Sequence, residues 1–271
     1  MLKYLIVDIK TMLRLPFTLI FGLFFPLFML FILMTSFGNF TTGDGYKFID
    51  TMFFISLGLG LLPTTLQTFP SYIAGNIEKN YMKRLKFWNI KYSTIIISDI
   101  IIHFILVSIS LAINVLFSFF VYDLTLPNFA HFMTFILQYI YNLITLLCLG
   151  AILGLLIKKV NVVYIVGLIL TFTAYFFTGS FGNFNTLPEW AQKVGNILPL
   201  KHFMHEMRNV FHNEVYFIKD FMTYNTILFA SVLFVLIVMV GYTYYKRNYF
   251  KRRGSNDVKK KCHKFNDIFS L

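Results

Sequence analysis

The residues whose chemistry stands out first are the histidines and the acid of the segment HFMHEMRNVFH. His202, His205, Glu206 and His212 lie close together there, and imidazole and carboxylate groups are common zinc ligands. On a helix, His202 shares a face with His205 or Glu206, so the group could hold a metal. However, the spacing matches no standard zinc motif, and Arg208 lies among the candidate ligands. We therefore expect an amphipathic outer helix here and assign no residue to a metal.

Sequence motifs for nucleotide hydrolysis and for covalent or metal catalysis are missing from the chain. It contains no GxxxxGK[ST] phosphate loop, no GxSxG nucleophile turn and no HExxH pair. An intramembrane enzyme would need a nucleophile with its base, or a metal cluster, within the apolar segments. We find neither, and therefore expect no catalytic residue, no enzymatic activity and no cofactor in this chain.

A second ionisable pair, Asp99 and His103, lies inside an apolar stretch. The two residues are four positions apart, so on a helix they face the same way. Ionisable groups within a membrane mark function by default, so one interpretation is a role in transport. The other interpretation is that the two side chains extend to the membrane surface or bond to each other. Asn114, Gln138 and Asn142 are expected to form hydrogen bonds between helices.

Two further features bear on helix packing and helix ends. Gly150, Ala151 and Gly154 form a small-xxx-small patch, which favours close contact between helices. Asp50 lies at the outer edge of an apolar run, where we expect water to reach it. Neither feature indicates a substrate site.

The elements that position these residues follow from the composition. Hydrophobic residues make up 57% of the 271 positions and charged residues only 13%, whereas soluble domains carry roughly 25% charged residues. The mean hydropathy is +0.68 and 34 residues are Phe. This composition excludes an ordinary soluble enzyme and a disordered chain. The two cysteines, Cys148 in an apolar run and Cys262 in a basic tail, imply no disulfide framework.

Six apolar stretches are long enough to cross a bilayer, which takes about 20 residues. They cover approximately residues 15–37, 48–74, 93–121, 129–157, 162–181 and 222–245. Their apolar character is continuous rather than alternating, which argues against a membrane β-barrel. We predict an all-α integral membrane protein whose six transmembrane helices occupy residues 15–245.

The positions of the basic residues predict the topology. Of the 24 Lys and Arg residues, 19 lie before the first span, between spans two and three, between spans four and five, and after span six. Basic residues collect on the cytoplasmic side, so both termini are expected in the cytoplasm. The net charge of +12 is therefore a topology signal, and we expect a lipid bilayer rather than a nucleic acid as its counterpart.

Four segments lie outside the spans. Residues 1–14 have an apolar helical face beside basic residues, which predicts an interfacial helix on the cytoplasmic leaflet. Residues 246–271 form a basic cytoplasmic tail, either bound to anionic lipid or solvated. The loop 75–92 mixes basic and apolar residues. The outer segment 182–221 is apolar but punctuated, which favours re-entrant helices, with Thr186 as a cap and a break at Pro199.

Together these elements resemble the permease subunit of ABC type-2 exporters, and two stretches carry the resemblance. The first, IEKNYMKRLKFW at 77–88, resembles the family's coupling segment, with Glu78 on the acidic position and Arg84 and Leu85 on the basic–apolar pair. The second stretch, at 178–211, resembles the family's pattern before its last transmembrane span. The shared features are a glycine, an LPxW motif and a second LP pair. The matching residues are Gly179, Pro188, Trp190 and Pro199.

The resemblance implies an assembly of several subunits. Two permease subunits would pair, as a homodimer or a heterodimer, and two ATPase subunits carrying ATP and Mg would dock beneath them. Glu78, Lys83, Arg84 and Leu85 would form the ATPase-coupling contact, and Gly179, Pro188, Trp190 and Pro199 an outer re-entrant gate. The substrate would be a hydrophobic or amphipathic drug, antimicrobial peptide or peptide toxin.

Other functions stay open at this point. The exporter could instead move a lipid or a glycan–lipid conjugate. An ATP-independent secondary transporter is another alternative, although such proteins usually place ionisable groups near the middle of the membrane. The Phe-, Ile-, Asn- and Lys-rich residue usage suggests an AT-rich bacterial genome, which would place the protein in a bacterial cell membrane.

Overall fold

The fold is known from a computed structural model, which describes residues 9, 20–41, 46–81, 92–180 and 184–239. The chain divides into two compact units, Met1–Phe229 and Ala230–Leu271, and each is described by itself. The described residues are helical apart from short connections, and their β structure is limited to one isolated bridge between Thr41 and Lys47. The prediction of an all-α protein is confirmed.

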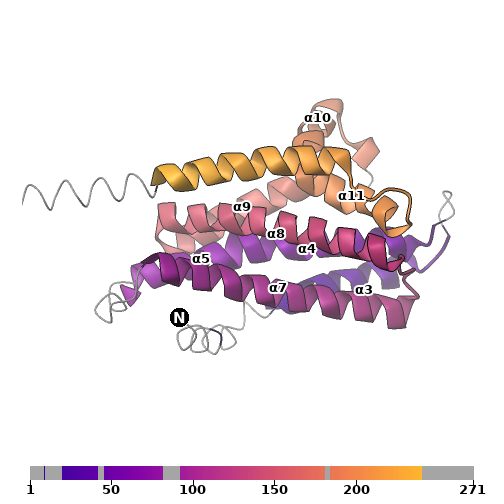
Figure 1. Cartoon of the computed structure of the whole chain (residues 1–271), viewed down its shortest axis with the longest axis horizontal. Coiled ribbons are helices and arrows are strands. Elements are labelled where there is room, and N and C mark those ends of the chain that lie inside the picture. Colours follow the sequence, from indigo (N-terminus) through magenta and orange to yellow (C-terminus); the bar gives the residue numbers. More distant parts are fainter. Residues whose placement is uncertain (1–8, 10–19, 42–45, 82–91, 181–183, 240–271) are drawn as a thin grey trace, which may run out of the picture. The chain divides into compact units, whose positions relative to one another are not determined.

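The helices of the first unit run roughly side by side (Figure 1). Their bounds are η1 Ile20–Phe24, α3 Phe25–Phe37, α4 Phe48–Pro63, η2 Thr64–Thr68, α5 Phe69–Glu78, α7 Tyr92–Tyr122, α8 Phe129–Ile157, α9 Val160–Thr178, η3 Phe184–Thr186, α10 Glu189–Ile197 and α11 Pro199–Phe211. A last described helix, Lys219–Met239, begins in the first unit and ends in the second.

Five described helices are long and apolar enough to cross a membrane. They are Phe48–Glu78, Thr94–Tyr122, Phe129–Ile157, Val160–Thr178 and Lys219–Met239, and they correspond to predicted spans two to six. The described part of the first predicted span is a shorter apolar helix, Gly22–Phe37. Apart from Ile9, the interfacial helix predicted at 1–14 lies outside the described residues, as does the basic tail at 246–271, so both stay predictions.

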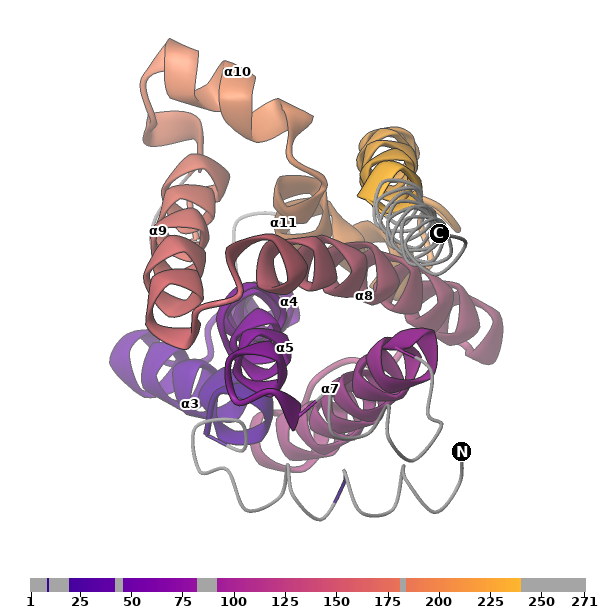
Figure 2. The same cartoon turned by 90° about the vertical axis from the view of Figure 1, so that its left-hand side faces the viewer.

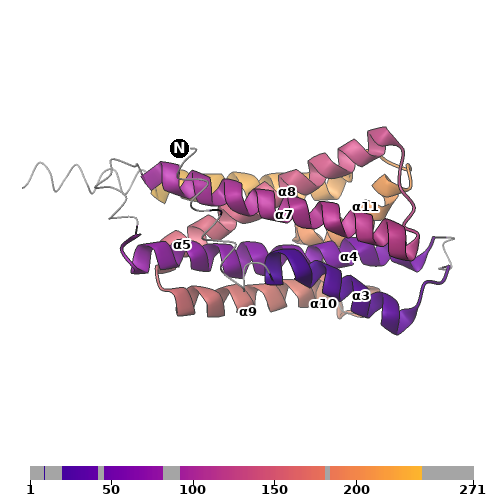
Figure 3. The same cartoon turned by 90° about the horizontal axis from the view of Figure 1, so that it is seen from below.

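Helices α4, η2 and α5 continue one another, and we call Phe48–Glu78 span two. In its most apolar stretch 89% of the residues are buried, against 22% in α9. Figure 2 shows α4 and α5 in the middle, with α3, α7, α8 and α9 around them, and Figure 3 shows α4 and α5 following one line. Span two ends at Glu78, so the first residues of the predicted loop 75–92 are helical.

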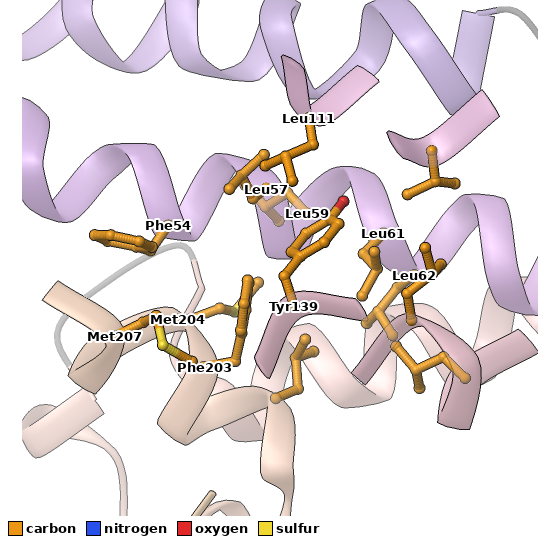
Figure 4. Close-up of a cluster of buried hydrophobic side chains, with 14 of the residues drawn as sticks. Phe54, Leu57, Leu59, Leu61, Leu62, Leu111, Tyr139, Phe203, Met204 and Met207 are labelled. Atoms are coloured by element: carbon orange, nitrogen blue, oxygen red, sulfur yellow. The ribbon is translucent and has the colours of Figure 1, made fainter. Parts of the chain in front are cut away.

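The core fills the space between span two and the outer helix α11. Phe54 and Leu57 of α4, Tyr139 of α8, and Phe203 and Met207 of α11 belong to one buried cluster (Figure 4). Although α11 is too short to cross a membrane, Phe203 and Met207 are completely buried. The predicted outer segment is thus packed into the protein on one face.

Close backbone approach replaces side-chain packing at the small residues of α8. A Cβ added at Gly150 would lie 2.2 Å from the carbonyl oxygen of Thr65, and one added at Gly154 would lie 2.7 Å from that of Pro70. Ala151 between them is 1% exposed. The predicted role of this patch in close helix packing is confirmed.

The outer segment contains two helices with a sharp corner between them. Leu198 ends α10 and precedes α11, and Pro199 is the first residue of α11, as the predicted break requires. The predicted cap at Thr186 is wrong, because Thr186 lies in the 3-10 turn η3 and Pro188 directly precedes α10. Leu187 and Pro188 separate η3 from α10, so Pro188 rather than Thr186 takes the position before the helix.

Candidate functional site

The end of span two that precedes the predicted coupling loop is joined to the start of α9 by Glu78. Its Oε2 atom accepts a hydrogen bond of 3.0 Å from the backbone N–H of Val160, the first residue of α9. The first N–H groups of a helix lack partners within it, and a carboxylate there is also favoured by the helix dipole. The preceding residue, Lys159, provides no side-chain cap. A residue of span two therefore caps α9.

The chain turns sharply just after this contact. Asn80 has a positive φ of 53°, and its N–H donates to the Ile77 carbonyl at 3.0 Å. Asn tolerates this left-handed conformation well at the end of a helix. The other three predicted coupling residues, Lys83, Arg84 and Leu85, lie outside the described residues, and their role stays a prediction.

The predicted gate residues lie where α9 meets α10. Gly179 ends α9 with a positive φ of 65°, and a Cβ there would lie 2.9 Å from the Cα of Phe184. Only glycine adopts this conformation and spacing without strain. The Trp190 ring of α10 lies 5.8 Å from the ring of Phe177, so α10 packs on the last turn of α9.

The two prolines of the predicted gate act on helix ends. Pro188 comes directly before α10, and Pro199 opens α11. Gly195 lies between them in sequence, and a Cβ there would lie 2.2 Å from the carbonyl oxygen of Phe177. This arrangement holds α10 tightly against α9, while Trp190 stays 59% exposed.

The histidines of α11 form an ion-pair network rather than one ligand cluster. His202 Nδ1 and Lys201 Nζ each lie 2.7 Å from Glu206 Oε1, and His202 Nε2 lies 2.8 Å from the Asn196 carbonyl oxygen. These acceptors are a carboxylate and a backbone carbonyl, so each ring nitrogen of His202 has an oxygen partner. Burial raises the pKa of Glu206, but the hydrogen bonds with His202 and Lys201 outweigh it and lower the pKa to about 2.

This network brings three metal-type ligands together. Single ligand atoms of His202, Glu206 and Asp220 lie within 4.8 Å of one another. However, the 2.7 Å between His202 and Glu206 is a hydrogen-bond distance, whereas two ligands on tetrahedral zinc at about 2.0 Å lie roughly 3.3 Å apart. The geometry is that of a proton-bridged network.

The other two histidines of the segment point elsewhere. His205 Nε2 bonds to the Thr178 carbonyl at 2.7 Å, tying α11 to the last turn of α9. Burial lowers the pKa of His205, outweighing the hydrogen bond. His212 Nε2 instead lies 3.3 Å from Asp50 Oδ2 of α4. The four residues singled out in the sequence thus serve three separate contacts.

A model of the ABC-2 type transporter family matches residues 5–212, most of the chain. The chain belongs to the ABC-2 type transporter family. It is accordingly a multi-pass membrane permease subunit of an ABC transporter, as the resemblance of its coupling and outer segments implied. No curated protein and no solved structure gives a significant match.

In this permease, Asp50 is not the water-exposed residue that its position in the sequence suggested. It is 1% exposed. Its Oδ1 accepts hydrogen bonds from the N–H and the hydroxyl of Thr125, at 3.3 and 2.8 Å, and its Oδ2 accepts one of 3.2 Å from the Lys47 N–H. With His212 alongside, Asp50 joins α4, the α7–α8 connection and the end of α11. The expectation was wrong because these partners lie far away in sequence.

The inner pair of the permease, Asp99 and His103, is completely buried in this chain. His103 Nδ1 bonds to the backbone carbonyl of Asp99 at 2.9 Å, and the Asp99 carboxylate receives a long bond of 3.5 Å from the Asn76 amide. The side chains therefore neither bond to each other nor reach the surface, as one interpretation expected. His103 instead lies against the Phe69 ring, with centroids 4.7 Å apart.

The mid-span amides follow the expectation only in part. Gln138 bonds to the Tyr216 carbonyl and the Ile218 N–H, at 3.1 and 3.2 Å, and so connects α8 with the chain before the last helix. Asn114 bonds within its own helix, to the Ser110 carbonyl at 3.0 Å. Asn142 has no hydrogen-bond partner among the described residues. The predicted bond between elements is confirmed for Gln138 alone.

Proposed function

We propose that this permease forms the transmembrane path of an ATP-driven exporter in a bacterial cell membrane, with both termini in the cytoplasm. Two copies of a separate ATPase subunit dock on the cytoplasmic loop at Glu78, Lys83, Arg84 and Leu85, and a second permease subunit completes the path. ATP and Mg bind to the ATPase subunits. The outer gate contains Gly179, Pro188, Trp190 and Pro199.

The observation that carries this proposal is the bond from Val160 to Glu78. It lies at the cytoplasmic end of both helices, directly before the loop on which an ATPase would act. Motion of that loop reaches span two through the chain and α9 through Glu78. Loop movement can drive transport only if the ATPase binds the two permease conformations with different free energies.

A hydrophobic or amphipathic substrate fits the side chains of the described spans. Away from the helix ends, Asp99 and His103 are the acidic, basic or imidazole side chains found in them. A highly charged solute would therefore find few partners, whereas an apolar one would meet Phe, Ile and Leu side chains. A drug, an antimicrobial peptide or a peptide toxin suits this surface.

The overall test is to express the permease with a Walker-type ATPase encoded beside its gene. We expect the pair to protect a deletion strain against members of a panel of drugs and antimicrobial peptides, and the purified permease alone to hydrolyse no ATP. Protection by the permease without an active ATPase would contradict the proposal. Changes in cell-surface lipid or glycan, with unaltered drug survival, would redirect the substrate assignment to a lipid conjugate.

The coupling contact is tested by Glu78→Ala. We expect ATP hydrolysis by the pair to continue while transport per ATP falls by at least roughly tenfold, since one hydrogen bond to a charged group is worth about 1.5 kcal/mol or more. Glu189→Ala is the matched control, because Glu189 is also acidic and lies exposed on the outer helix α10. Normal transport by the Glu78 variant would remove this residue from the coupling contact.

A further inference from the structure

Span two contains two prolines, and each leaves a backbone carbonyl without its usual helical donor. A proline has no N–H for the carbonyl four residues earlier, so Pro63 cannot serve Leu59 and Pro70 cannot serve Leu66. The hydroxyl of Tyr175 in α9 donates to the Leu59 carbonyl at 2.5 Å, with both residues buried. A side chain of α9 therefore takes the place of the missing N–H of Pro63.

The neighbouring carbonyls of span two accept hydrogen bonds from side chains of the same helix. The Thr64 hydroxyl donates to the Gly60 carbonyl at 3.0 Å, and the Thr65 hydroxyl to the Leu61 carbonyl at 2.8 Å. These two threonines begin η2, a π-helical segment of five residues. Such segments are uncommon and occur frequently at functional positions. The Leu59 bond is thus a link between helices placed directly beside a π segment.

The same side of α9 follows span two towards the cytoplasm. A Cβ at Gly167 would lie 2.0 Å from the Leu66 carbonyl oxygen, so α9 approaches the backbone that Pro70 cannot serve. Further down, the Val160 N–H bonds to Glu78. Val160, Gly167 and Tyr175 are spaced by seven and eight residues, which places them on one face of a helix.

We propose that Tyr175 is the positioning residue that makes α9 follow span two as one body during transport. A displacement at Glu78 turns span two about the π segment Thr64–Thr68, and the Tyr175–Leu59 bond carries that movement into the outer half of α9. From there Gly179 and the contact with Trp190 pass it to α10. This inference rests on the proposed function, since it names the residues through which the ATPase contact would open the outer side.

The decisive experiment compares Tyr175→Phe, Pro63→Ala and the double variant in the reconstituted ATPase–permease pair. Tyr175→Phe removes the donor, and we expect transport per ATP to fall roughly fivefold and Tm to fall by about 3 °C. Pro63→Ala restores an N–H for the Leu59 carbonyl. The double variant should therefore recover Tm but not transport per ATP. Tyr164→Phe, on the same helix, is the control and should change neither.

Recovery of both quantities in the double variant would overturn the proposal, because Tyr175 would then only satisfy a buried carbonyl. Wild-type transport by Tyr175→Phe would overturn it as well. Failure of the unaltered pair to transport any panel compound would instead count against the proposed function. The two failures are therefore distinguishable.

A cross-link provides a second test that does not depend on removing Tyr175. A Cβ at Gly75 would lie 3.4 Å from Cγ2 of Val160, so Gly75→Cys with Val160→Cys places two thiols within disulfide reach. Cys148 and Cys262 are replaced by Ser in this background. If α5 and α9 move as one body, oxidation leaves transport unchanged. Loss of transport that a reductant restores would show relative movement and overturn the proposal.

Discussion

The two halves of span two are packed in different ways. In the first half, α4, large side chains fill the space: Phe53 and Phe54 are completely buried, and each lies against Phe211 of α11 at 5.8 and 5.3 Å. In the second half, η2 and α5, the backbone itself approaches neighbouring helices, at Gly150 and Gly167. Side chains pack in this half as well, since Phe69 and Ile73 are completely buried, but the glycines add close contacts with its backbone.

This difference indicates how each half responds to a substitution. Interdigitated side chains resist displacement because any shift opens cavities or creates overlaps. A glycine lying against carbonyl groups has no side chain that must leave a pocket. A polar contact holds the start of α4 as well, because Asp50 joins three elements. We infer that side-chain packing fixes α4, whereas η2 and α5 are held to α8 and α9 by close backbone contact.

Among the substitutions that test this comparison, Asp50→Ala is expected to have the largest effect on stability. It leaves Thr125, the Lys47 N–H and His212 without their shared acceptor, which we expect to lower stability by about 3 kcal/mol and Tm by roughly 8 °C. Thermal unfolding of the purified permease in detergent measures this change. Asp123→Asn, at an exposed acid of the α7–α8 connection, is the control and should alter Tm little, because Asn tolerates the positive φ of 54° there. Equal shifts in the two variants would argue against a special role for Asp50.

In the second half we expect a smaller effect on stability but a marked one on transport. Gly167→Ala places a methyl group 2.0 Å from the Leu66 carbonyl oxygen, and overpacking of this kind costs about 2 kcal/mol. Gly75→Ala is the matched control, because its nearest neighbour would be the Val160 side chain at 3.4 Å. Tm and transport per ATP should both fall in the first variant and stay near normal in the second. Full transport by Gly167→Ala would contradict a role for this close contact in transport.

The smallest effect concerns pH on the outer side. Burial lowers the pKa of His205 from its ordinary value of 6.5, so the folded protein favours the neutral ring. Its stabilising effect is fully present above pH 6.5 and declines as the pH falls through that value, because the unfolded chain then binds the proton more readily. We expect acidification from pH 7.5 to 5.5 to lower Tm by about 2 °C.

The His205→Gln variant isolates this effect. Glutamine keeps a donor for the Thr178 carbonyl but does not titrate. The difference in Tm between wild type and variant should therefore depend on pH, with the wild type losing more on acidification. Parallel Tm curves for the two proteins would show that His205 does not contribute.

The sequence predicts those features that depend on neighbouring residues. Continuous apolar runs located the five described membrane-length helices, because a lipid environment demands about 20 apolar residues in a row. Gly150 and Gly154 indicated close packing, and Pro199 indicated a corner, since both effects act locally. The extension of span two to Glu78 was missed because the polar residues after Ala74 resemble a loop, although α8 and α9 cover that turn.

The contacts of Asp50 and Tyr175 could not be predicted in the same way. Asp50 bonds to Thr125 and His212, and Tyr175 to Leu59, 116 positions away. The sequence did contain part of the signal, because Pro63 inside an apolar helix leaves the Leu59 carbonyl without a backbone donor. A single sequence does not show that Tyr175 is the residue that donates to it. The sequence likewise showed the histidines in and after α11 as a group, but in the folded protein they contact three different partners.

The unequal lengths of the helices have a consequence for the surrounding bilayer. With 31 residues, α7 is about 46 Å long, while α9 with 19 residues is about 28 Å long, against a hydrocarbon core of about 30 Å. Tilt alone would need about 50° to fit α7, beyond the usual range of roughly 40°, so α7 must project into the headgroup layers. Shared equally, about 8 Å projects at each end, and Asp99, about 10 Å from the start of α7, lies near the boundary of the hydrocarbon. Membrane thickness would thus set how deeply this acid is immersed.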